Sequence, residues 1–319
     1  MKIRTLDLFH GAGGSSLGAR AANAEIVAGI DFWNIASDCY SKNFPDVYAI
    51  NANICDVSPE EIHRIIGDID LIIASPECTN HTCAKGAAVR SEESRLTAFE
   101  VVRFATEFMP RWIVLENVVH MQSWDAYPRL KNNFEKLGYK IRVQKLNAMD
   151  FGVPQSRRRL FLICSLLDLP EEIRTAGIDI KPASTFIDFN GSYSFNPLFS
   201  DKRAKATVER ARRAMAELGK NEHFLIVYYG TDQSGGWQPV DRPLRTVTTL
   251  DRFAYVKPSP KGHMMRMLQP EELKSAMGFP PSYILESGVR RDKVRLMGNA
   301  VCPPMMESIV KSLISQDRK

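Results

Sequence analysis

The sequence predicts an α/β protein built on a doubly wound, mostly parallel sheet, with a smaller second domain. Through residues 1–164, short β-type runs alternate with helical stretches, which is the pattern of parallel strands joined by helices. Glycines follow the first of these runs directly, as they do where a strand turns into a helix. After residue 164 the alternation fades into a stretch that mixes Pro, Gly, Ser and aromatic residues. This change predicts the second, loop-rich domain.

The predicted strands have the length and apolar content of buried strands. They lie at residues 3–8, 25–30, 47–50, 69–74, 111–115, 139–146 and 158–164. Helices are predicted between and after them, at residues 15–22, 34–44, 58–67, 93–109, 204–219 and 303–316.

Two of these helices carry specific signals. Ser58 and Pro59 predict a helix start, because serine caps the free N–H groups and proline suits the first turn. In 93–109, apolar residues recur at spacings of three and four, which predicts an amphipathic helix packed on the sheet. The residues of that stripe are Leu96, Phe99, Val102, Ala105 and Met109. The helix at 204–219 offers Arg203, Arg210, Arg212 and Arg213 for one side.

Composition indicates a soluble globular protein. The chain has 319 residues and a mass of 36.0 kDa, and 44% of its residues are hydrophobic, enough to bury a large core. It has no run of eighteen apolar residues, and its first residues lack the pattern of a signal peptide, so we expect a cytoplasmic protein that does not contact membranes. Six scattered cysteines favour reduced thiols over a disulfide framework.

Positive charge is concentrated in the second half of the chain. Residues 1–150 carry 16 Lys and Arg against 19 Asp and Glu, whereas residues 151–319 carry 26 against 18. A basic half favours a polyanionic partner such as nucleic acid, although ordinary surface solvation also explains such an imbalance.

The first strand delivers the segment DLFHGAGGSSLG, residues 7–18. Glycines between a parallel strand and a helix allow a ligand to approach the backbone. The segment lacks the G-K-[ST] of a nucleoside triphosphate site and the G-x-G-x-x-G of a dinucleotide site. Asp31 ends the second strand, where a carboxylate reaches the ribose of an adenosine-containing cofactor. A tight turn and a surface acid are the alternative interpretation.

Cys78 follows the fourth predicted strand in a polar loop, on the side where open α/β sheets bind ligands. The next strand ends in LENV, which brings Glu116 and Asn117 to the same edge. A nucleophile and an acid then face one pocket, whereas a buried inert cysteine is the alternative. Cys78, His81 and Cys83 resemble half a zinc site, but no second ligand cluster accompanies them, so we expect no metal.

The segment PQSRRR, residues 154–159, supplies Gln155, Arg157 and Arg159 at alternate positions. If it begins a strand, Arg157 and Arg159 project from one face. Two guanidinium groups there suit a phosphate, a base oxygen or a carboxylate. Surface arginines are the alternative.

Seven segments in order resemble the C5-cytosine-specific DNA methyltransferase family. They are DLFHGAGGSSLG, ASPEC, LENV, PQSRRR, RPLRTVTT (242–249), LQPEELKSAMGFP (268–280) and GNAVCPP (298–304). The resemblance covers residues 1–164 and 241–315. It implies the fold of S-adenosylmethionine-dependent methyltransferases: a catalytic and cofactor-binding domain at 1–164, a target recognition region at 165–240 and a return segment at 241–319. The final helix is expected to pack on the first.

The resemblance also implies roles for individual residues. Cys78 would be the nucleophile, Glu116 would act on N3 of the cytosine, and Arg159 would orient Glu116 and the base; Asn117, Gln155 and Arg157 would support the pocket. The residues expected to bind S-adenosylmethionine, and its product S-adenosylhomocysteine, are Phe9, Gly11, Ala12, Gly13, Gly14, Asp31, Phe32, Asn53, Ile54, Pro76, Asn299, Ala300 and Val301.

The implied reaction needs these residue types. Cytosine C5 is a poor nucleophile, so a thiolate first adds at C6 while an acid assists at N3. C5 then takes the methyl group, and loss of the C5 proton and of the thiol releases the product. Because C5 and C6 are stacked inside duplex DNA, the base is flipped out, at a cost of a few kcal/mol.

Four residues depart from the family pattern: Glu77 between Pro76 and Cys78, Asn53, His10 and Cys302. A carboxylate beside a thiol raises the pKa of that thiol, so we expect Glu77 to face a basic partner. The expected partner molecule is double-stranded DNA, bound by a monomer; a cognate restriction endonuclease is left open. Two alternatives remain, a methyltransferase that acts on tRNA and a catalytically inactive DNA-binding homologue.

Overall fold

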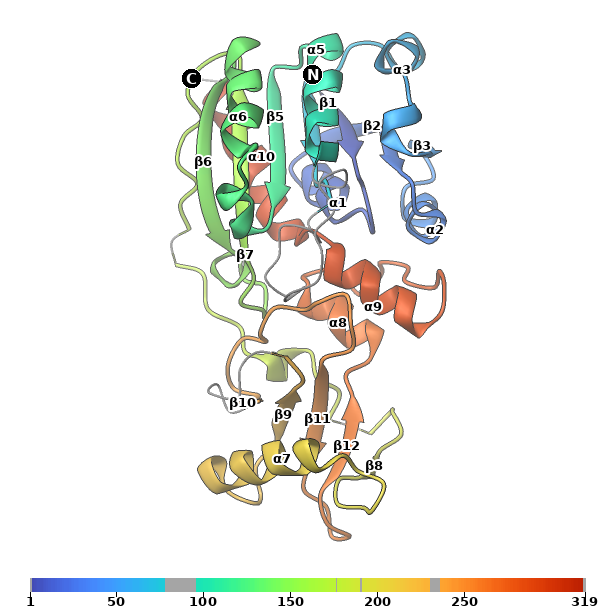
Figure 1. Ribbon diagram of the computed structural model, residues 1–319, viewed down its shortest axis with the longest axis vertical. Coiled ribbons are helices and arrows are strands. Elements are labelled where there is room, and N and C mark those ends of the chain that lie inside the picture. Colours follow the sequence, from blue (N-terminus) through green and yellow to red (C-terminus); the bar gives the residue numbers. More distant parts are fainter. Residues whose placement is uncertain (1, 78–95, 176, 190, 230–235, 318–319) are drawn as a thin grey trace.

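The computed structural model describes residues 2–77, 96–175, 177–189, 191–229 and 236–317. These residues form a seven-stranded and a five-stranded sheet. The larger sheet occupies the upper part of Figure 1, and the smaller one lies below it. Two helices near the C-terminus, α8 and α9, lie between the two sheets (Figure 1).

All seven predicted strands are present in the larger sheet. They are β1 (Ile3–Leu8), β2 (Ala24–Asp31), β3 (Tyr48–Asn51), β4 (Leu71–Ala74), β5 (Trp112–Asn117), β6 (Lys140–Asn147) and β7 (Arg158–Ser165). Their order is β3-β2-β1-β4-β5-β7-β6. The first five are parallel, and β7 pairs antiparallel with both β5 and β6. The prediction of a mostly parallel sheet is confirmed.

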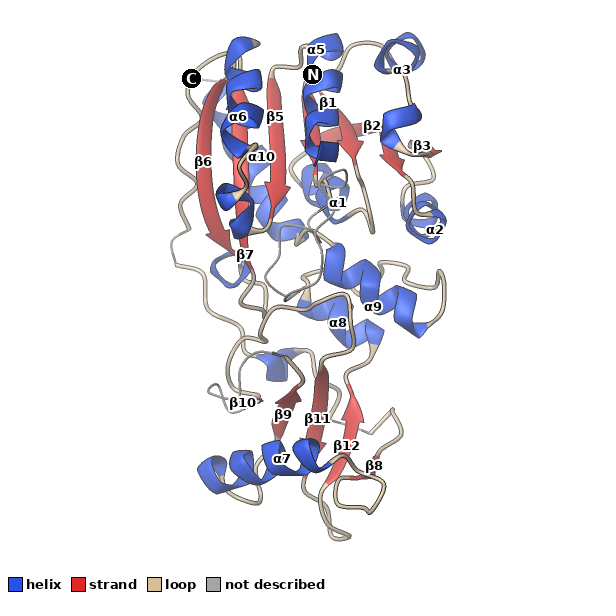
Figure 2. Ribbon diagram, viewed as in Figure 1, coloured by secondary structure: helices blue, strands red, loops and turns tan. Residues whose placement is uncertain are grey.

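Helices cover both faces of this sheet, as Figure 2 shows. Along β4, Leu71 and Ile73 belong to one hydrophobic cluster, while Ile72 and Ala74 belong to another. This alternation follows from the two-residue period of a strand and requires an apolar cover on each side. One cluster includes side chains of α1 (Gly14–Ala21), α2 (Asn34–Asn43) and α10 (Pro303–Asp317); the other includes side chains of α3 (Pro59–Ile66), α5 (Glu100–Phe108) and α6 (Tyr127–Lys136).

Two helix predictions can be compared in detail. The side chain of Ser58 accepts a hydrogen bond from the Glu61 N–H group at 3.2 Å, so the predicted cap of α3 is confirmed. The predicted stripe of α5 is right in part: Ala105 is buried and Phe99 and Val102 pack partly buried against the core, but Leu96 and Met109 are exposed. The buried residues are Val101, Phe104, Ala105 and Phe108. The predicted residues and the buried residues both recur at spacings of three and four, and the buried residues face the sheet.

The last helix packs on the first, as expected: α10 lies against α1. Gly18 permits this approach, because a Cβ atom at that position would lie 2.3 Å from the carbonyl oxygen of Pro303. The C-terminal segment therefore completes the domain that the N-terminal segment begins.

The smaller sheet is antiparallel and was not predicted as a sheet. Its strands are β8 (Asn196–Pro197), β9 (Phe224–Val227), β10 (Trp237–Pro239), β11 (Phe253–Lys257) and β12 (Met264–Met267), in the order β10-β9-β11-β12-β8. Helix α7 (Lys205–Leu218) packs on it through a separate hydrophobic cluster. Because this sheet takes strands from both sides of residue 240, we propose that the target recognition region continues to about residue 267.

On α7, Arg212 and Arg213 are exposed and Arg210 is partly buried, as is Arg203 two residues before the helix. Arg203 donates to the carbonyl oxygen of Pro197, and the Arg210 guanidinium lies over the ring of Tyr228. The expectation of four arginines on one side is therefore corrected: only Arg212 and Arg213 are exposed, because the other two hold α7 on the domain.

The remaining elements are short. They are α8 (Pro270–Ala276), α9 (Arg290–Asn299) and 3-10 turns at Ile54–Asp56, Thr97–Phe99, Val119–Ser123, Ala148–Phe151 and Ala183–Thr185. Across the described ranges, no helix combines the length and the apolar character that a membrane span requires.

Candidate active site

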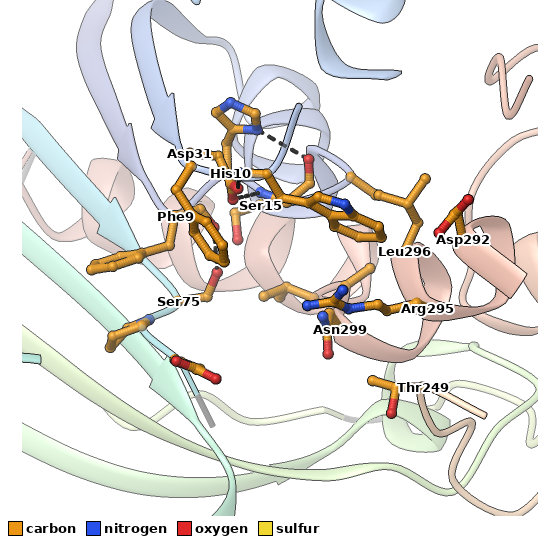
Figure 3. A pocket seen from close by; sticks show the side chains of 18 of the residues that line it. Phe9, His10, Ser15, Asp31, Ser75, Thr249, Asp292, Arg295, Leu296 and Asn299 are labelled. Carbon is orange, nitrogen blue, oxygen red and sulfur yellow. Dashed lines mark hydrogen bonds between the residues drawn. The ribbon is translucent and has the colours of Figure 1, made fainter. Parts of the chain in front are cut away.

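A cleft of about 470 Å³ opens where the carboxyl ends of the parallel strands meet α9. Figure 3 shows side chains from the turn after β1, the ends of β2 and β4, and α9 directed into it. Its lining residues are Phe9, His10, Gly11, Ala12, Ser15, Asp31, Phe32, Trp33, Ser75, Pro76, Glu77, Glu116, Thr249, Leu250, Arg291, Asp292, Arg295, Leu296, Asn299, Ala300 and Val301.

The glycine-rich turn after β1 forms one end of the cleft. Phe9 and Gly11 have positive φ angles of 62° and 53°, and Gly11 adopts such a conformation without strain. Asp31 fixes the turn through its two carboxylate oxygens, which accept hydrogen bonds from the Gly11 N–H at 2.9 Å and the Trp33 N–H at 2.8 Å. The carboxylate expected at the end of β2 therefore also shapes the turn beside it.

A buried polar network lies beneath this turn. The hydroxyl of Ser16 lies 2.6 Å from Asp7 and 2.8 Å from the hydroxyl of Tyr40, whose ring stacks on that of His10 at 3.9 Å. Burial raises the pKa of Asp7 to about 8, although the bond to Ser16 opposes this shift. Burial also lowers the pKa of His10, against the attraction of Asp31. Both groups are thus held in their neutral forms near pH 7.

His10 also contacts the turn directly. Its Nδ1 lies 3.0 Å from the carbonyl oxygen of Gly11. Because a carbonyl oxygen only accepts hydrogen bonds, this contact assigns the proton of the neutral ring to Nδ1. A residue that departs from the family pattern therefore supports the glycine-rich turn from below.

Nine of the residues predicted to bind a cofactor line the cleft. They are Phe9, Gly11, Ala12, Asp31, Phe32, Pro76, Asn299, Ala300 and Val301.

The structure does not bring the other four, Gly13, Gly14, Asn53 and Ile54, to the cleft wall. Cβ atoms at Gly13 and Gly14 would collide with Phe44 and with the backbone of Val301, so these glycines serve close packing. Asn53 accepts a hydrogen bond from the Cys55 N–H, and Ile54 is buried in the core.

The other end of the cleft contains a buried acid paired with an arginine. Glu116 Oε1 lies 2.9 Å from Arg159 Nε, and 7% and 11% of the two side chains are exposed. Burial raises the pKa of Glu116, while the charges of Arg159 and Arg157 oppose the shift. The expected contact between Arg159 and Glu116 is present, and it leaves a carboxyl group that keeps its proton more readily than a surface acid does.

Asn117 joins two strand ends at this position. Its side chain donates to the carbonyl oxygen of Pro76 at 3.1 Å and accepts from the Val118 N–H at 2.8 Å. The chain that leads into residue 78 is therefore tied to the end of β5.

Gln155 and Arg157 lie behind the cleft wall and are fully buried. Arg157 donates to the carbonyl oxygens of Val247, Gly298 and Ala300 at 2.8 to 3.0 Å. Gln155 donates to Ala276 and accepts from the Val247 N–H, both at 2.9 Å. The two side chains hold the return segment against β7. Arg158, between Arg157 and Arg159, is exposed.

The predicted nucleophile, Cys78, lies outside the described residues, as do His81 and Cys83. Its neighbours Pro76 and Glu77 line the cleft, and a basic partner for Glu77 stays a prediction. The described cysteines are free thiols. Three of them are buried, and burial raises the pKa of Cys39 and of Cys302 to about 11 and that of Cys164 further. A protonated buried thiol is a poor nucleophile.

Several lining residues were not predicted. Thr249 ends the RPLRTVTT segment, and Trp33 follows Asp31 by two positions. Arg291 and Arg295 precede Asn299 by eight and four residues on α9, a spacing that places all three on one helix face. Recognising residues 290–299 as a helix would have predicted both arginines at the site.

Comparisons with known proteins agree with this arrangement. The family model described as C-5 cytosine-specific DNA methylase matches residues 3–315. The type II methyltransferase M.HindV of Haemophilus influenzae is 25% identical, over 99% of this chain and 98% of its own. M.DdeI of Desulfomicrobium norvegicum is 35% identical over 176 residues, which are 53% of this chain and 42% of that protein.

Solved structures resemble the whole chain. The methyltransferase EhMeth of Entamoeba histolytica has a TM-score of 0.73 and 17% identity, with 100% of both chains covered. A DNMT2 variant of Spodoptera frugiperda has a TM-score of 0.72 and 17% identity, covering 98% of this chain and 100% of its own. At these identities the likeness shows the fold.

Proposed function

The chain belongs to the C-5 cytosine-specific DNA methylase family, and we propose that it transfers a methyl group from S-adenosylmethionine to C5 of a cytosine in duplex DNA. The single observation that carries this proposal is the pairing of Glu116 with Arg159 in the same cleft as the glycine-rich turn. A proton donor for a base and a cradle for a nucleoside cofactor then share one space.

The residues present fit S-adenosylmethionine. Gly11 has open space where a Cβ would lie, so the backbone there admits a ligand. Asp31 has one hydrogen bond to each carboxylate oxygen, which leaves lone pairs for ribose hydroxyls. Phe9 and Phe32 offer aromatic surface for adenine, and Asn299 lies across the cleft. When bound, S-adenosylmethionine supplies an electrophilic methyl group.

The chain's own residues would activate the cytosine. The sulfur of Cys78 adds to C6 and the Glu116 carboxyl donates its proton to N3, which places electron density on C5. C5 would then take the methyl group, which leaves S-adenosylhomocysteine. A general base would remove the C5 proton, the C6–S bond would break to release the Cys78 thiolate, and N3 would return its proton to Glu116. The raised pKa of Glu116 suits this exchange, since burial makes its carboxyl group hold a proton more readily than a surface acid does.

DNA would enter from the side of the smaller sheet. A cytosine stacked inside a duplex cannot reach the buried Glu116, so the base would be flipped out of the duplex. The basic half of the chain, which includes the smaller sheet, supplies positive charge for the phosphates. The names of the type II relatives favour a role beside a restriction endonuclease, which we propose as the functional partner.

A trapping experiment tests this function. The protein is incubated with S-adenosylmethionine and either duplex DNA or tRNA containing 5-fluorocytosine. We expect a covalent complex with DNA that survives denaturation, because fluorine at C5 cannot leave as a proton. Cys78→Ser should remove both the complex and methyl transfer to ordinary DNA, measured by bisulfite sequencing.

Cys83→Ser is the matched control, because it changes the second cysteine of the same segment. It should still form the complex. Methyl transfer by Cys78→Ser, or a complex with tRNA and none with DNA, would contradict the proposal.

A further inference from the structure

The charge of the cleft is unbalanced in favour of acids. Asp31, Glu77 and Asp292 line it, Glu116 is a fourth lining acid that is paired with Arg159, and His10 is buried with a lowered pKa. Among the lining residues that the structure describes, only Arg291 and Arg295 carry a permanent positive charge. A negatively charged ligand group would therefore be repelled by Asp31 and Glu77 and attracted to the arginines of α9.

Arg295 is held in place by stacking. Its Cζ atom lies 4.3 Å from the centroid of the Trp33 ring, a distance at which a guanidinium and an indole attract each other. The backbone N–H of Trp33 is bonded to Asp31, so the indole is anchored to the turn that shapes the cleft. The stack thereby fixes the cation beside the glycine-rich turn.

The donors of Arg295 are not used within the described part of the chain. No hydrogen bond or ion pair joins its guanidinium to another described residue. Arg290, five residues earlier on the same helix, differs: it bonds to Asp251, Gln269 and the carbonyl oxygen of Leu268. Arg290 therefore holds the fold together, whereas the Arg295 donors remain for a ligand.

Helical register places Arg295 next to the cofactor contact predicted at the end of α9. Arg295 and Asn299 are four residues apart and both line the cleft. Figure 3 shows the two side chains projecting from α9 into the same space, with Thr249 near them. Arg291, one turn further away from Asn299, marks the outer end of the same face.

We propose that Arg295 binds the carboxylate of the methionine moiety of S-adenosylmethionine, an inference that rests on the proposed function. The amino-acid end of this cofactor is a zwitterion with one carboxylate and one ammonium group. Acids in the cleft suit the ammonium and the sulfonium. The carboxylate requires N–H donors, and a guanidinium supplies two in the geometry that matches it.

Calorimetric binding of two ligands tests the assignment. S-adenosylhomocysteine carries the carboxylate, and its decarboxylated analogue keeps the ammonium group alone. The unaltered protein should prefer S-adenosylhomocysteine by roughly tenfold or more, as expected for a charge-assisted pair. In Arg295→Met the two dissociation constants should agree within about twofold, because only the carboxylate loses its partner.

Two further variants separate position from charge. Arg291→Met removes the neighbouring cation on the same helix face and should keep the preference. Arg295→Lys keeps the positive charge but lacks the paired N–H donors of a guanidinium, so it should keep part of the preference for S-adenosylhomocysteine. If Arg295→Met weakens both ligands equally, the arginine supports the cleft wall and the inference is overturned. It is equally overturned if this variant changes only the salt dependence of DNA binding, which would assign Arg295 to a phosphate.

The result also distinguishes the two proposals. If the original protein methylates DNA and binds S-adenosylhomocysteine, but Arg295→Met still prefers S-adenosylhomocysteine to its decarboxylated analogue, the proposed function stands and the inference about Arg295 is wrong. If the original protein binds neither ligand, both the proposed function and the inference about Arg295 are wrong.

Discussion

Asp7 illustrates how a single buried group connects the fold to the site. It is fully buried beneath the glycine-rich turn, and its pKa is raised to about 8. The folded protein therefore keeps a proton that the unfolded chain releases near pH 4. Between these values the free energy of unfolding must fall as pH rises, because the folded state binds more protons.

We expect Asp7→Asn to remove this dependence. The difference in unfolding free energy between the variant and the original protein should grow with pH from 5 to 8, by at most about 1.4 kcal/mol per pH unit. Urea unfolding at several pH values measures it. Asp125→Asn, at an exposed position, is the control and should give a constant difference. If the unfolding free energies of Asp7→Asn and of the original protein change in parallel with pH, the Asp7 carboxyl group is already ionised in the folded protein.

At the scale of elements, the contact between α1 and α10 decides whether the chain's two ends form one domain. At Gly18, the backbone of α1 lies against the backbone of α10. A Cβ atom there would lie 2.3 Å from the Pro303 oxygen and 2.9 Å from the Glu307 nitrogen. Backbone atoms cannot move aside as a flexible side chain can, so the two helices would have to separate.

We therefore expect Gly18→Ala to lower the free energy of unfolding by about 1–3 kcal/mol through overpacking. In an exposed helix the same change would stabilise, because alanine has the higher helix propensity, so even the sign of the effect is informative. Ser41→Ala, an exposed site on α2, should change the value by less than about 0.5 kcal/mol. Denaturant unfolding measures both variants, and a stabilised Gly18→Ala would contradict the packing described.

At the scale of the whole molecule, charge is divided between the two halves of the chain, and the smaller sheet lies in the basic half, residues 151–319. The basic second half should neutralise DNA phosphates and release counterions, so affinity for duplex DNA should fall by at least about tenfold between 50 and 200 mM salt. Binding of S-adenosylhomocysteine, measured over the same range, is the internal control and should change far less. An equally flat response for DNA would exclude phosphate contacts as the main source of affinity.

Much of the larger domain followed from the sequence, because its determinants are local. Seven apolar strands, the Ser58 cap and the glycine-rich turn each depend on neighbouring residues, and the motif order placed Glu116 and Arg159 near one another. Helix α5 shows the limit: two apolar stripes shared one period, and only the position of the sheet selected Val101 and Phe104 over Leu96 and Met109.

Tertiary structure alone decided the contacts between distant segments. Arg157 was expected to support the pocket, but its partners could not be predicted: buried bonds to Val247, Gly298 and Ala300 link the start of β7 to the return segment. The smaller sheet joins strands across residue 240, and α9 turns Arg295 toward Trp33. The sequence determined the local elements and the residue types of the chemistry, because short-range propensity and patterning act within a few residues. Which side chains meet depends on packing over hundreds of residues, which only the folded chain resolves.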